Sequence, residues 1–313
     1  MKKSRKYSPK INMADVAKKA NVSKMTVSRA INHPSNVSKS TLYKINKIIK
    51  KTNFSVNQTA KFFRSGATNN IFCFIPTLVG GNFNEYVSGI LSEAEKFRMK
   101  VIIEIYDYSL KTEEEILTSC LSFNPKGIIL VGLEHTKKTK KILKNCQIPI
   151  VETWDTSNTP IDRLVGFSHY NLGYDITDAM LKKYKKILFV RSNYSSQKGD
   201  YIRGQKKFIG YRDRILKEKR KVNFIDINSL DFLESGKEII SFLKKKRNDK
   251  IDCVICDEIC ALGTIHEANK LKIKIPEKLA IVGIGNSQTV QLSSPKLTTV
   301  DINSYKIGKK AVS

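Results

Sequence analysis

The chain has 313 residues, 41% of them hydrophobic, and a formal net charge of +27 at pH 7. It contains no run of about 18 apolar residues, which argues against a transmembrane helix, and no apolar segment follows the basic N-terminus, which argues against export. We therefore expect a cytoplasmic protein of two or three domains, without membrane contact, whose partner is anionic.

The positive charge is concentrated at the N-terminus. Residues 1–64 contain 16 Lys and Arg residues and a single acidic residue, Asp15. Such a surface attracts the phosphate backbone of nucleic acids. A generally lysine-rich composition explains part of the basicity, but it does not explain why one end of the chain is so poor in acids. The charge therefore indicates a nucleic-acid-binding domain at the N-terminus.

Residues 11–56 are predicted to form three short helices. Asn12 and Asp15 have the spacing of a capping box at the start of the first helix. Asn21 makes the turn, Ser23 caps the second helix, and the third helix covers about residues 38–51. Two short helices joined by a tight turn, with a polar and basic face left free on the second, form a helix-turn-helix whose second helix enters the DNA major groove.

The second of these helices presents its polar face to DNA if Val27, Ala30 and Ile31 face inward. Arg29 can then bind guanine bidentately, and Met25 can pack against a thymine methyl group. Hydroxyl side chains on this face are better suited to phosphates. The expected DNA contacts on this helix are Lys24, Met25, Thr26, Ser28, Arg29 and Asn32.

Residues 70–313 alternate short apolar runs with helical stretches, which is typical of parallel α/β sheets. About nine strands are expected. That number exceeds one comfortable sheet and favours two α/β lobes. The clearest runs are residues 71–75, 101–105, 128–131, 148–151, 164–167, 186–190, 253–255 and 279–282.

Cys253, Cys256 and Cys260 have a C-x2-C-x3-C spacing that could indicate a metal or iron–sulfur site. Because the first two fall in an apolar run of strand type, where cysteine behaves as a small apolar residue, we expect a structural role. No fourth ligand is evident nearby. We expect neither a metal nor a cofactor.

The N-terminal segment resembles the headpiece of the LacI/GalR family of bacterial transcription regulators. The matching residues are Asp15-Val16-Ala17, Val22-Ser23, Thr26-Val27-Ser28-Arg29, Asn32, Val37-Ser38 and Asn57. The family usually has Gly at the position of Asn21, a mild departure because Asn tolerates a left-handed conformation. Lys24-Met25 followed by Thr-Val-Ser-Arg is similar to the gluconate-repressor branch.

The remainder of the chain resembles the periplasmic-binding-protein-like effector domain of the same family, with Val165-Gly166-Phe167-Ser168 and Gly283-Ile284-Gly285-Asn286 again similar to the gluconate-repressor branch. The resemblance implies an N-terminal all-α helix-turn-helix headpiece followed by an α/β effector domain of two lobes. The implied parts are a basic tail (1–10), a helix-turn-helix DNA-binding domain (11–56), a hinge helix and linker (57–69), and a two-lobed effector-binding and dimerisation domain (70–313). Its first lobe would cover about 70–162 and 290–313, and its second about 163–289.

The resemblance also implies a hinge helix that includes Asn57, Ala60 and Phe63. Paired hinges of a homodimer lie in the minor groove, where an apolar side chain opens a central base step. Phe63 occupies the position of that side chain, usually Leu. The alternative is that Phe62 and Phe63 pack against the effector domain.

Between the lobes, the resemblance implies a site for a small sugar or sugar acid. Asp257 stands where the family binds ligand hydroxyls, and Lys207 where it places Arg or Lys. The expected effector residues are Thr77, Phe83, Trp154, Phe167, Lys207 and Asp257. The family usually has Asp at the position of Glu258, Asn at that of His169, and commonly Asp at that of Gly285. Fewer acids and a retained Lys favour an anionic ligand. The alternatives are that Lys207 is a solvated charge and that Phe83 or Phe167 belongs to the core.

The resulting hypothesis is a homodimeric repressor that reads a near-palindromic operator and loses affinity for it when effector binds. An activator would have the same sequence features, since operator placement decides the sign of regulation. A cytoplasmic solute-binding protein would share the body but not the headpiece. Gly283-Ile284-Gly285 is a fragment of a dinucleotide-binding motif without its third glycine, and we do not expect an enzyme.

Overall fold

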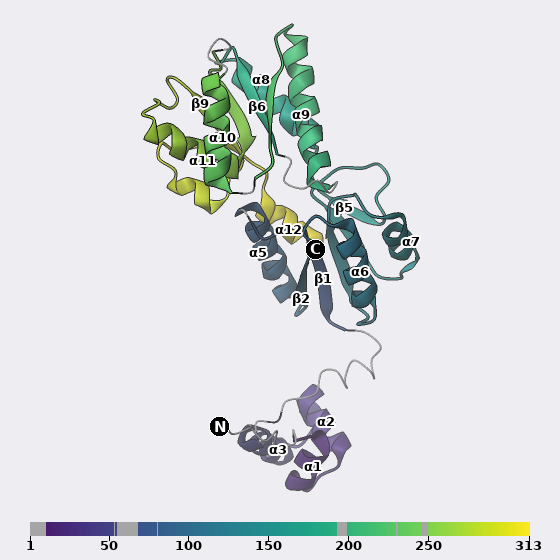
Figure 1. Cartoon of the computed structure of the whole chain (residues 1–313). Helices are drawn as coiled ribbons and strands as arrows, with labels where there is room; N and C mark the ends of the chain where they lie inside the picture. Colours follow the sequence, from purple (N-terminus) through teal and green to yellow (C-terminus); the bar gives the residue numbers. More distant parts are fainter. Residues whose placement is uncertain are drawn as a thin grey trace, which may run out of the picture. The chain divides into compact units, whose positions relative to one another are not determined.

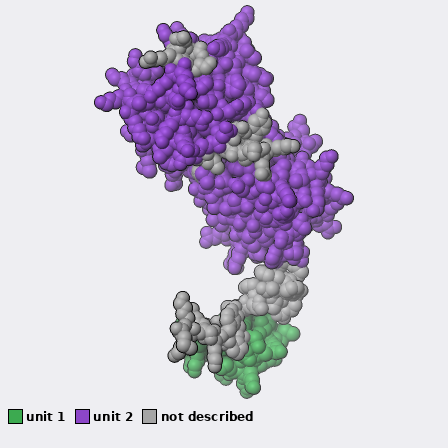
Figure 2. Space-filling view, viewed as in Figure 1, with its two compact units in different colours: residues 1–67 green, residues 68–313 purple. Residues whose placement is uncertain are grey.

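The structure, a computed structural model, describes residues 11–52, 54, 68–79, 81–192, 199–229, 231–245 and 250–313. The chain divides into two compact units, residues 1–67 and residues 68–313, which are coloured separately in Figure 2. The expected hinge residues Asn57, Ala60 and Phe63 lie outside the described residues.

The first unit begins with a helix whose ends are set by local hydrogen bonds. α1 (Met13–Ala20) starts at a capping box, in which Asn12 Oδ1 accepts from Asp15 N at 3.2 Å and Asp15 Oδ2 accepts from Asn12 N at 2.8 Å. It ends at Asn21, which has a left-handed conformation with φ of 53°. Both ends therefore follow from the residue types that were expected there.

Two further helices complete this unit. α2 (Lys24–Asn32) is capped by Ser23, whose hydroxyl accepts from Thr26 N at 3.1 Å, and α3 (Lys39–Thr52) follows a short 3-10 turn, η1 (Pro34–Asn36). The three helices enclose a small core. Its buried residues are Val16, Ala17, Ala20, Val27, Ala30 and Ile45, and Ile31, Leu42, Ile48 and Ile49 pack against them.

The second unit contains two parallel sheets, and we refer to each sheet with its helices as a lobe. Among the described residues, the first sheet has the order β2-β1-β3-β4-β5 and the second the order β10-β9-β8-β6-β7. The strands of the first sheet are β1 (Asn70–Ile75), β2 (Lys100–Ile105), β3 (Gly127–Val131), β4 (Ile150–Thr153) and β5 (Arg163–Val165). Those of the second are β6 (Ile187–Ser192), β7 (Asn223–Ile227), β8 (Cys253–Asp257), β9 (Ala280–Gly285) and β10 (Thr298–Asp301).

Helices cover both faces of each sheet, as parallel sheets require (Figure 1). The helices of the first lobe are α5 (Gly81–Lys96), α6 (Leu110–Leu121), α7 (Lys137–Asn145) and α12 (Ser304–Val312). Those of the second are α8 (His169–Leu181), α9 (Gly199–Lys217), α10 (Phe232–Lys245) and α11 (Glu258–Lys270), together with the short 3-10 turn η3 (Gln288–Leu292). The closest helix pairs are α5 with α12, α8 with α9, and α10 with α11. None of the described helices has the length and hydropathy that a membrane span requires.

The lobe limits lie further along the chain than expected. Residues 163–165, expected to open the second lobe, form β5 and pair with β4 in the first sheet. Residues 298–301, expected in the first lobe, form β10 and pair with β9 in the second sheet. Only α12 then returns to the first lobe, where Ile307 and Ala311 enter the core. An apolar run predicts a strand but carries no information on which sheet it joins.

Several strand predictions also needed correction. Residues 148–149 precede β4 rather than belong to it, and β7 and β10 were not predicted. β7 contains Asn223 and Asp226, so it does not read as an apolar run. It lies at the edge of the second sheet, where polar residues in a strand are tolerated.

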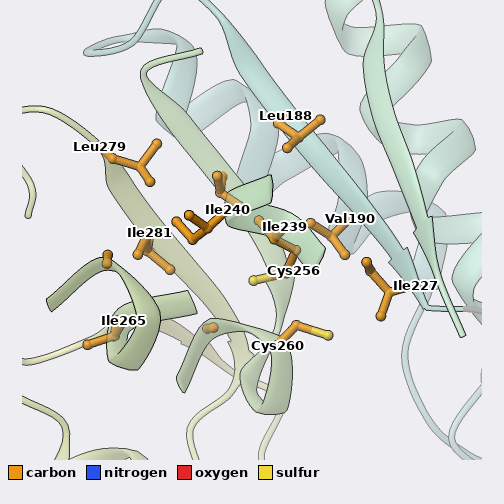
Figure 3. Close-up of a cluster of buried hydrophobic side chains, with 13 residues drawn as sticks. Leu188, Val190, Ile227, Ile239, Ile240, Cys256, Cys260, Ile265, Leu279 and Ile281 are labelled. Atoms are coloured by element: carbon orange, nitrogen blue, oxygen red, sulfur yellow. The ribbon is translucent and has the colours of Figure 1, made fainter. Parts of the chain in front are cut away.

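The cysteines of the C-x2-C-x3-C segment are buried in the core of the second lobe. Cys256 and Cys260 pack among Leu188, Val190 and Ile281 (Figure 3). Burial raises the pKa of the Cys256 thiol well above its usual range. These thiols therefore act as small apolar groups.

Candidate functional site

The second helix of the first unit presents a basic surface to solvent. Lys24, Arg29 and Asn32 are exposed, and Met25 between them is 63% exposed. Thr26 and Ser28 are partly buried at the edge of this surface. Residues 11–52 carry nine Lys and Arg residues, all of them exposed, against one acid. An exposed, basic face on the second helix of a helix-turn-helix is the arrangement expected of a helix that enters a groove of DNA.

Two polar side chains on this helix already have partners. The Thr26 hydroxyl lies 2.9 Å from the Ser23 hydroxyl, and Asn32 Nδ2 donates to the Ser28 carbonyl at 2.9 Å. Lys24, Met25 and Arg29 extend beyond this local network. These three are the candidates for contact with base edges.

The second unit contains a cavity of about 110 Å³ that is lined by both lobes. Its walls come mainly from the carboxyl ends of parallel strands and the loops that follow them, the place where open α/β sheets bind ligands. The lining residues are Val79, Asn82, Phe83, Tyr108, Trp154, Phe167, His169, Leu172, Arg203, Lys207, Asp257, Glu258, Ile259, Ile284 and Ile302.

Five of the six expected effector residues line this cavity: Phe83, Trp154, Phe167, Lys207 and Asp257. Thr77 is not among the lining residues. It is buried, and its hydroxyl accepts a hydrogen bond from Val79 N at 3.0 Å. Thr77 therefore shapes the loop after β1, and Val79 reaches the cavity in its place.

One wall is aromatic. The ring centres of Phe83 and Trp154 lie 4.8 Å apart, and the Phe167 ring centre lies 6.3 Å from that of Trp154. Both phenylalanines also pack against the core of the first lobe, so the core and lining interpretations both hold. The indole Nε1 of Trp154 is buried and has no hydrogen-bond partner within the described part of the chain.

Two cations reach the cavity from α9. Lys207 forms an ion pair with Asp257, and its side chain is only 12% exposed, so it is not a solvated surface charge. Arg203 was not predicted. It is 7% exposed, and its guanidinium lies 6.0 Å from the Tyr108 ring centre. The signal was available in the sequence, because residues four apart share one face of a helix.

His169 supplies a buried acceptor. Its Nε2 lies 2.7 Å from the Trp154 carbonyl, which can only accept, so Nε2 carries the proton. Burial, together with the nearby cations Lys207 and Arg203, holds the pKa of His169 well below its usual range. The ring is therefore neutral, and its buried Nδ1 is an acceptor with no partner among the described residues.

The acid that the resemblance leads us to expect at position 285 is absent, while Asp257 and Glu258 both line the cavity. Glu258 is buried, and its Oε2 accepts from Ser287 N at 3.0 Å. A Cβ on Gly285 would lie 2.3 Å from that oxygen and 2.7 Å from Asn82 Nδ2. The longer acid at position 258 thus fills the space beside the glycine. Burial raises the pKa of the Glu258 carboxyl.

The lobes are joined by polar contacts on both sides of the cavity. Lys206 Nζ donates to Asp155 Oδ2 at 2.6 Å, which ties α9 to the loop after β4. Glu85 Oε1 accepts from Gln288 N at 2.9 Å, which ties α5 to η3. The two lobes therefore approach each other closely on both sides of the cavity.

Comparisons with known proteins agree with both units. Residues 12–57 match the family described as "Bacterial regulatory proteins, lacI family", and residues 184–313 match "Periplasmic binding protein-like domain". The HTH-type transcriptional regulator IdnR of Escherichia coli is 28% identical over 306 residues, which cover 96% of this chain and 90% of that protein. Catabolite control protein A of Staphylococcus aureus is 27% identical over 302 residues, which cover 95% and 89%.

A solved structure extends this agreement to the fold. The crystal structure of a LacI family transcriptional regulator from Silicibacter pomeroyi has a TM-score of 0.86 and 28% identity, and the match covers 96% of this chain and 90% of that one. The chain therefore belongs to the lacI family of bacterial regulatory proteins, as a transcriptional regulator, rather than an enzyme, that binds DNA and a small-molecule effector.

Proposed function

We propose that this protein is a cytoplasmic, homodimeric repressor that binds a near-palindromic operator and releases it when a small sugar acid occupies the cavity. The observation that carries the choice of ligand is the pair of acids in the cavity wall, Asp257 and Glu258, which line it together with aromatic side chains. Carboxyl oxygens accept hydrogen bonds from hydroxyl groups. A ligand rich in hydroxyl groups therefore fits this wall.

The rest of the lining supports an acidic polyol. The Phe83–Trp154–Phe167 wall offers apolar faces to the C–H groups of a sugar chain. Arg203 and Lys207 provide positive charge for a carboxylate. The volume of about 110 Å³ limits the ligand to a small molecule.

Regulation follows from the position of the cavity between two lobes. A ligand that contacts both lobes favours one arrangement of them over another, and only this difference in affinity can move the equilibrium. We propose that the arrangement of the lobes sets the positions of the two headpieces of the dimer. A ligand that prefers the arrangement with low operator affinity lowers the affinity of the protein for its operator. By linkage, operator DNA lowers the affinity of the protein for the ligand by the same factor.

The test uses the full chain and a DNA duplex selected by it from a random library. Gluconate, 2-ketogluconate, glucose and sorbitol are each added while operator binding is followed by fluorescence anisotropy and protein stability by thermal unfolding. We expect gluconate or its keto derivative to raise the unfolding temperature and release the duplex. Release by glucose alone, or no effect of any of the four, would contradict the sugar-acid proposal. Failure to select any preferred duplex would contradict sequence-specific binding.

A further inference from the structure

α3 carries a second basic surface of the first unit, on the side of the helix that faces away from the core. We propose that this surface binds the phosphate backbone of a second DNA duplex, without regard to base sequence, so that the protein holds another segment of DNA in addition to its operator. The inference goes beyond the proposed function and does not depend on the identity of the effector.

The residues of α3 divide between two opposite faces. Ile45 is fully buried in the core of the first unit, and Leu42, Ile48 and Ile49 pack against that core. With 3.6 residues per turn, the residues between them point to the other side of the helix. The centre of this outer face, which we call the α3 surface, consists of Lys39, Tyr43, Lys47 and Lys50. All four are exposed to solvent, Tyr43 by 70%.

The positive charge of α3 has no acidic counterpart within the first unit. The helix contains five lysines and no acid, and residues 16–84 of the chain contain neither Asp nor Glu. The single acid of residues 1–67 is Asp15, and it belongs to the capping box of α1, where its Oδ2 accepts from Asn12 N. The lysines therefore produce a positive potential that attracts a polyanion.

This arrangement of lysines lowers the stability of the helix itself. Lys47 is three residues away from both Lys44 and Lys50, and four residues away from Lys51. Side chains at these spacings are neighbours on a helix, and like charges there repel each other. An anion that binds along the helix offsets this repulsion. The lysine spacing therefore favours the state in which a polyanion is bound.

Other lysine-rich helices of the chain differ from α3. α7 also has five lysines, but one of them, Lys138, is paired with Glu114 at 2.9 Å. α10 carries Glu234 and Glu238 in addition to its lysines. A lysine-rich composition alone therefore does not explain a helix surface without acids.

The α3 surface suits a duplex better than a single strand. The 14 residues of the helix extend over about 21 Å, the length of about six base pairs. Lysines at regular intervals on a rigid helix follow a regular row of phosphates, and the Tyr43 hydroxyl can donate to a phosphate oxygen. Single strands are instead bound by several aromatic side chains on which successive bases stack. Tyr43 is the only Phe, Tyr or Trp between residues 8 and 53.

The outer faces of α2 and α3 point in different directions. Both helices turn apolar residues, among them Val27 and Ile45, toward the same small core. Their exposed faces therefore point away from that core along different lines. The α3 surface is consequently assigned to a different duplex from the one whose groove α2 enters.

The test measures whether protein bound to one duplex captures another. The full chain is held on beads by an excess of the duplex that it selects from a random library, so that the exposed faces of α2 are occupied. A labelled duplex of unrelated sequence is then added. We expect the beads to retain it only when the protein is present. Retention should fall steeply with rising salt, because each phosphate contact releases counterions.

A combined variant, Lys39→Gln with Lys47→Gln and Lys50→Gln, removes the charge of the α3 surface. It should reduce retention of the labelled duplex at least about tenfold while its base preference for the selected duplex is unchanged. Its unfolding temperature should not fall, since repulsion within the helix is reduced. Tyr43→Phe should reduce retention about two- to tenfold, because only the hydroxyl is lost.

The matched control removes the same charge from the second unit, by Lys272→Gln with Lys274→Gln and Lys278→Gln, three exposed lysines. It should change retention less than about threefold, because salt screens distant surface charges. Equal retention by the two combined variants, whether high or low, would overturn the proposal: high retention would place the second duplex elsewhere on the protein, and low retention would show a general effect of net charge. Preferential capture of a labelled single strand would overturn the choice of a duplex as partner.

Discussion

Glu258 and Gly285 form a complementary pair in which one residue depends on the size of the other. The glutamate carboxyl occupies the volume that any side chain at position 285 would need. Gly285 also has a φ of 151°, a conformation that residues with a Cβ rarely adopt. A side chain at position 285 would therefore displace the Glu258 carboxyl, which lines the cavity.

The variant Gly285→Ala tests this pair. Because its Cβ would overlap Glu258 Oε2 and its backbone is strained, we expect a loss of about 2–4 kcal/mol in the free energy of unfolding, measured in urea. Gly127→Ala is the control, since the nearest atom to its Cβ is 3.6 Å away. It should change the free energy of unfolding by less than about 1 kcal/mol. If both substitutions changed the free energy of unfolding equally, position 285 would have space for a Cβ and the proposed pair would be wrong.

Arg29 is the residue on which operator preference should depend most strongly. Arg29→Ala should weaken binding to the selected duplex by about 1–3 kcal/mol and relax the preference at one base pair of each half-site, because a bidentate contact to guanine is lost. Lys50→Ala is the comparison, an exposed lysine on α3 rather than on the recognition surface. It should weaken all duplexes alike, if it acts at all. An unchanged base preference in Arg29→Ala would contradict the assignment of this helix face.

At the scale of elements, a buried triad joins α6, the loop after β3 and β4. His135 Nδ1 lies 2.7 Å from Glu113 Oε1, and its Nε2 lies 3.5 Å from Glu152 Oε1, with all three side chains almost fully buried. Burial alone would lower the pKa of His135, but the hydrogen bonds and charges of the two glutamates outweigh it and raise the pKa to about 9.

The triad makes the stability of the first lobe decrease at alkaline pH. The pKa of His135 is about 9 in the folded chain and about 6.5 when unfolded, so the stabilisation is complete below pH 6.5 and is lost as pH rises through 9. We expect the free energy of unfolding to fall by roughly 3 kcal/mol between pH 7 and pH 10. Other groups titrate in this range, so the measured quantity is the difference from His135→Gln. A parallel pH profile for the two proteins would contradict the assignment.

Elements differed in how far the sequence predicted them. α1 and α2 were predicted closely because caps at Asn12 and Ser23 and the apolar periodicity are local properties of the chain. The sheets that β5 and β10 join were not predicted correctly, because strand pairing is decided by contacts between residues distant in sequence.

The same limit applies to the cavity. The resemblance identified Lys207 and Asp257, whereas the reach of Glu258 into the space at Gly285 depends on packing that no motif encodes.

At the scale of the whole second unit, the polar contacts between the lobes that the described residues show include Lys206–Asp155, which is partly exposed. Such an ion pair contributes little free energy. A small contribution is nevertheless enough to shift the equilibrium between two arrangements of the lobes that have similar free energies. The pair therefore tunes how readily the lobes close without touching the ligand.

The variant Asp155→Asn tests this role. It should weaken gluconate and sorbitol by the same factor, about two- to fivefold, because it affects closure rather than a ligand contact. Small-angle X-ray scattering should report a more open average arrangement of the ligand-free chain. A change in the gluconate-to-sorbitol ratio would instead place Asp155 among the groups that recognise the carboxylate.

The return of α12 to the first lobe has a consequence for biosynthesis. Gly89 of α5 and Gly308 of α12 bring the two helices so close that their backbones touch, since a Cβ on either would lie 2.1 Å from a carbonyl oxygen of the other helix. The ribosome delivers α12 only after every strand of the other lobe. During synthesis, the surface of α5 that carries Tyr86 and Ile90 therefore remains exposed until the later part of the chain, which ends with α12, has emerged.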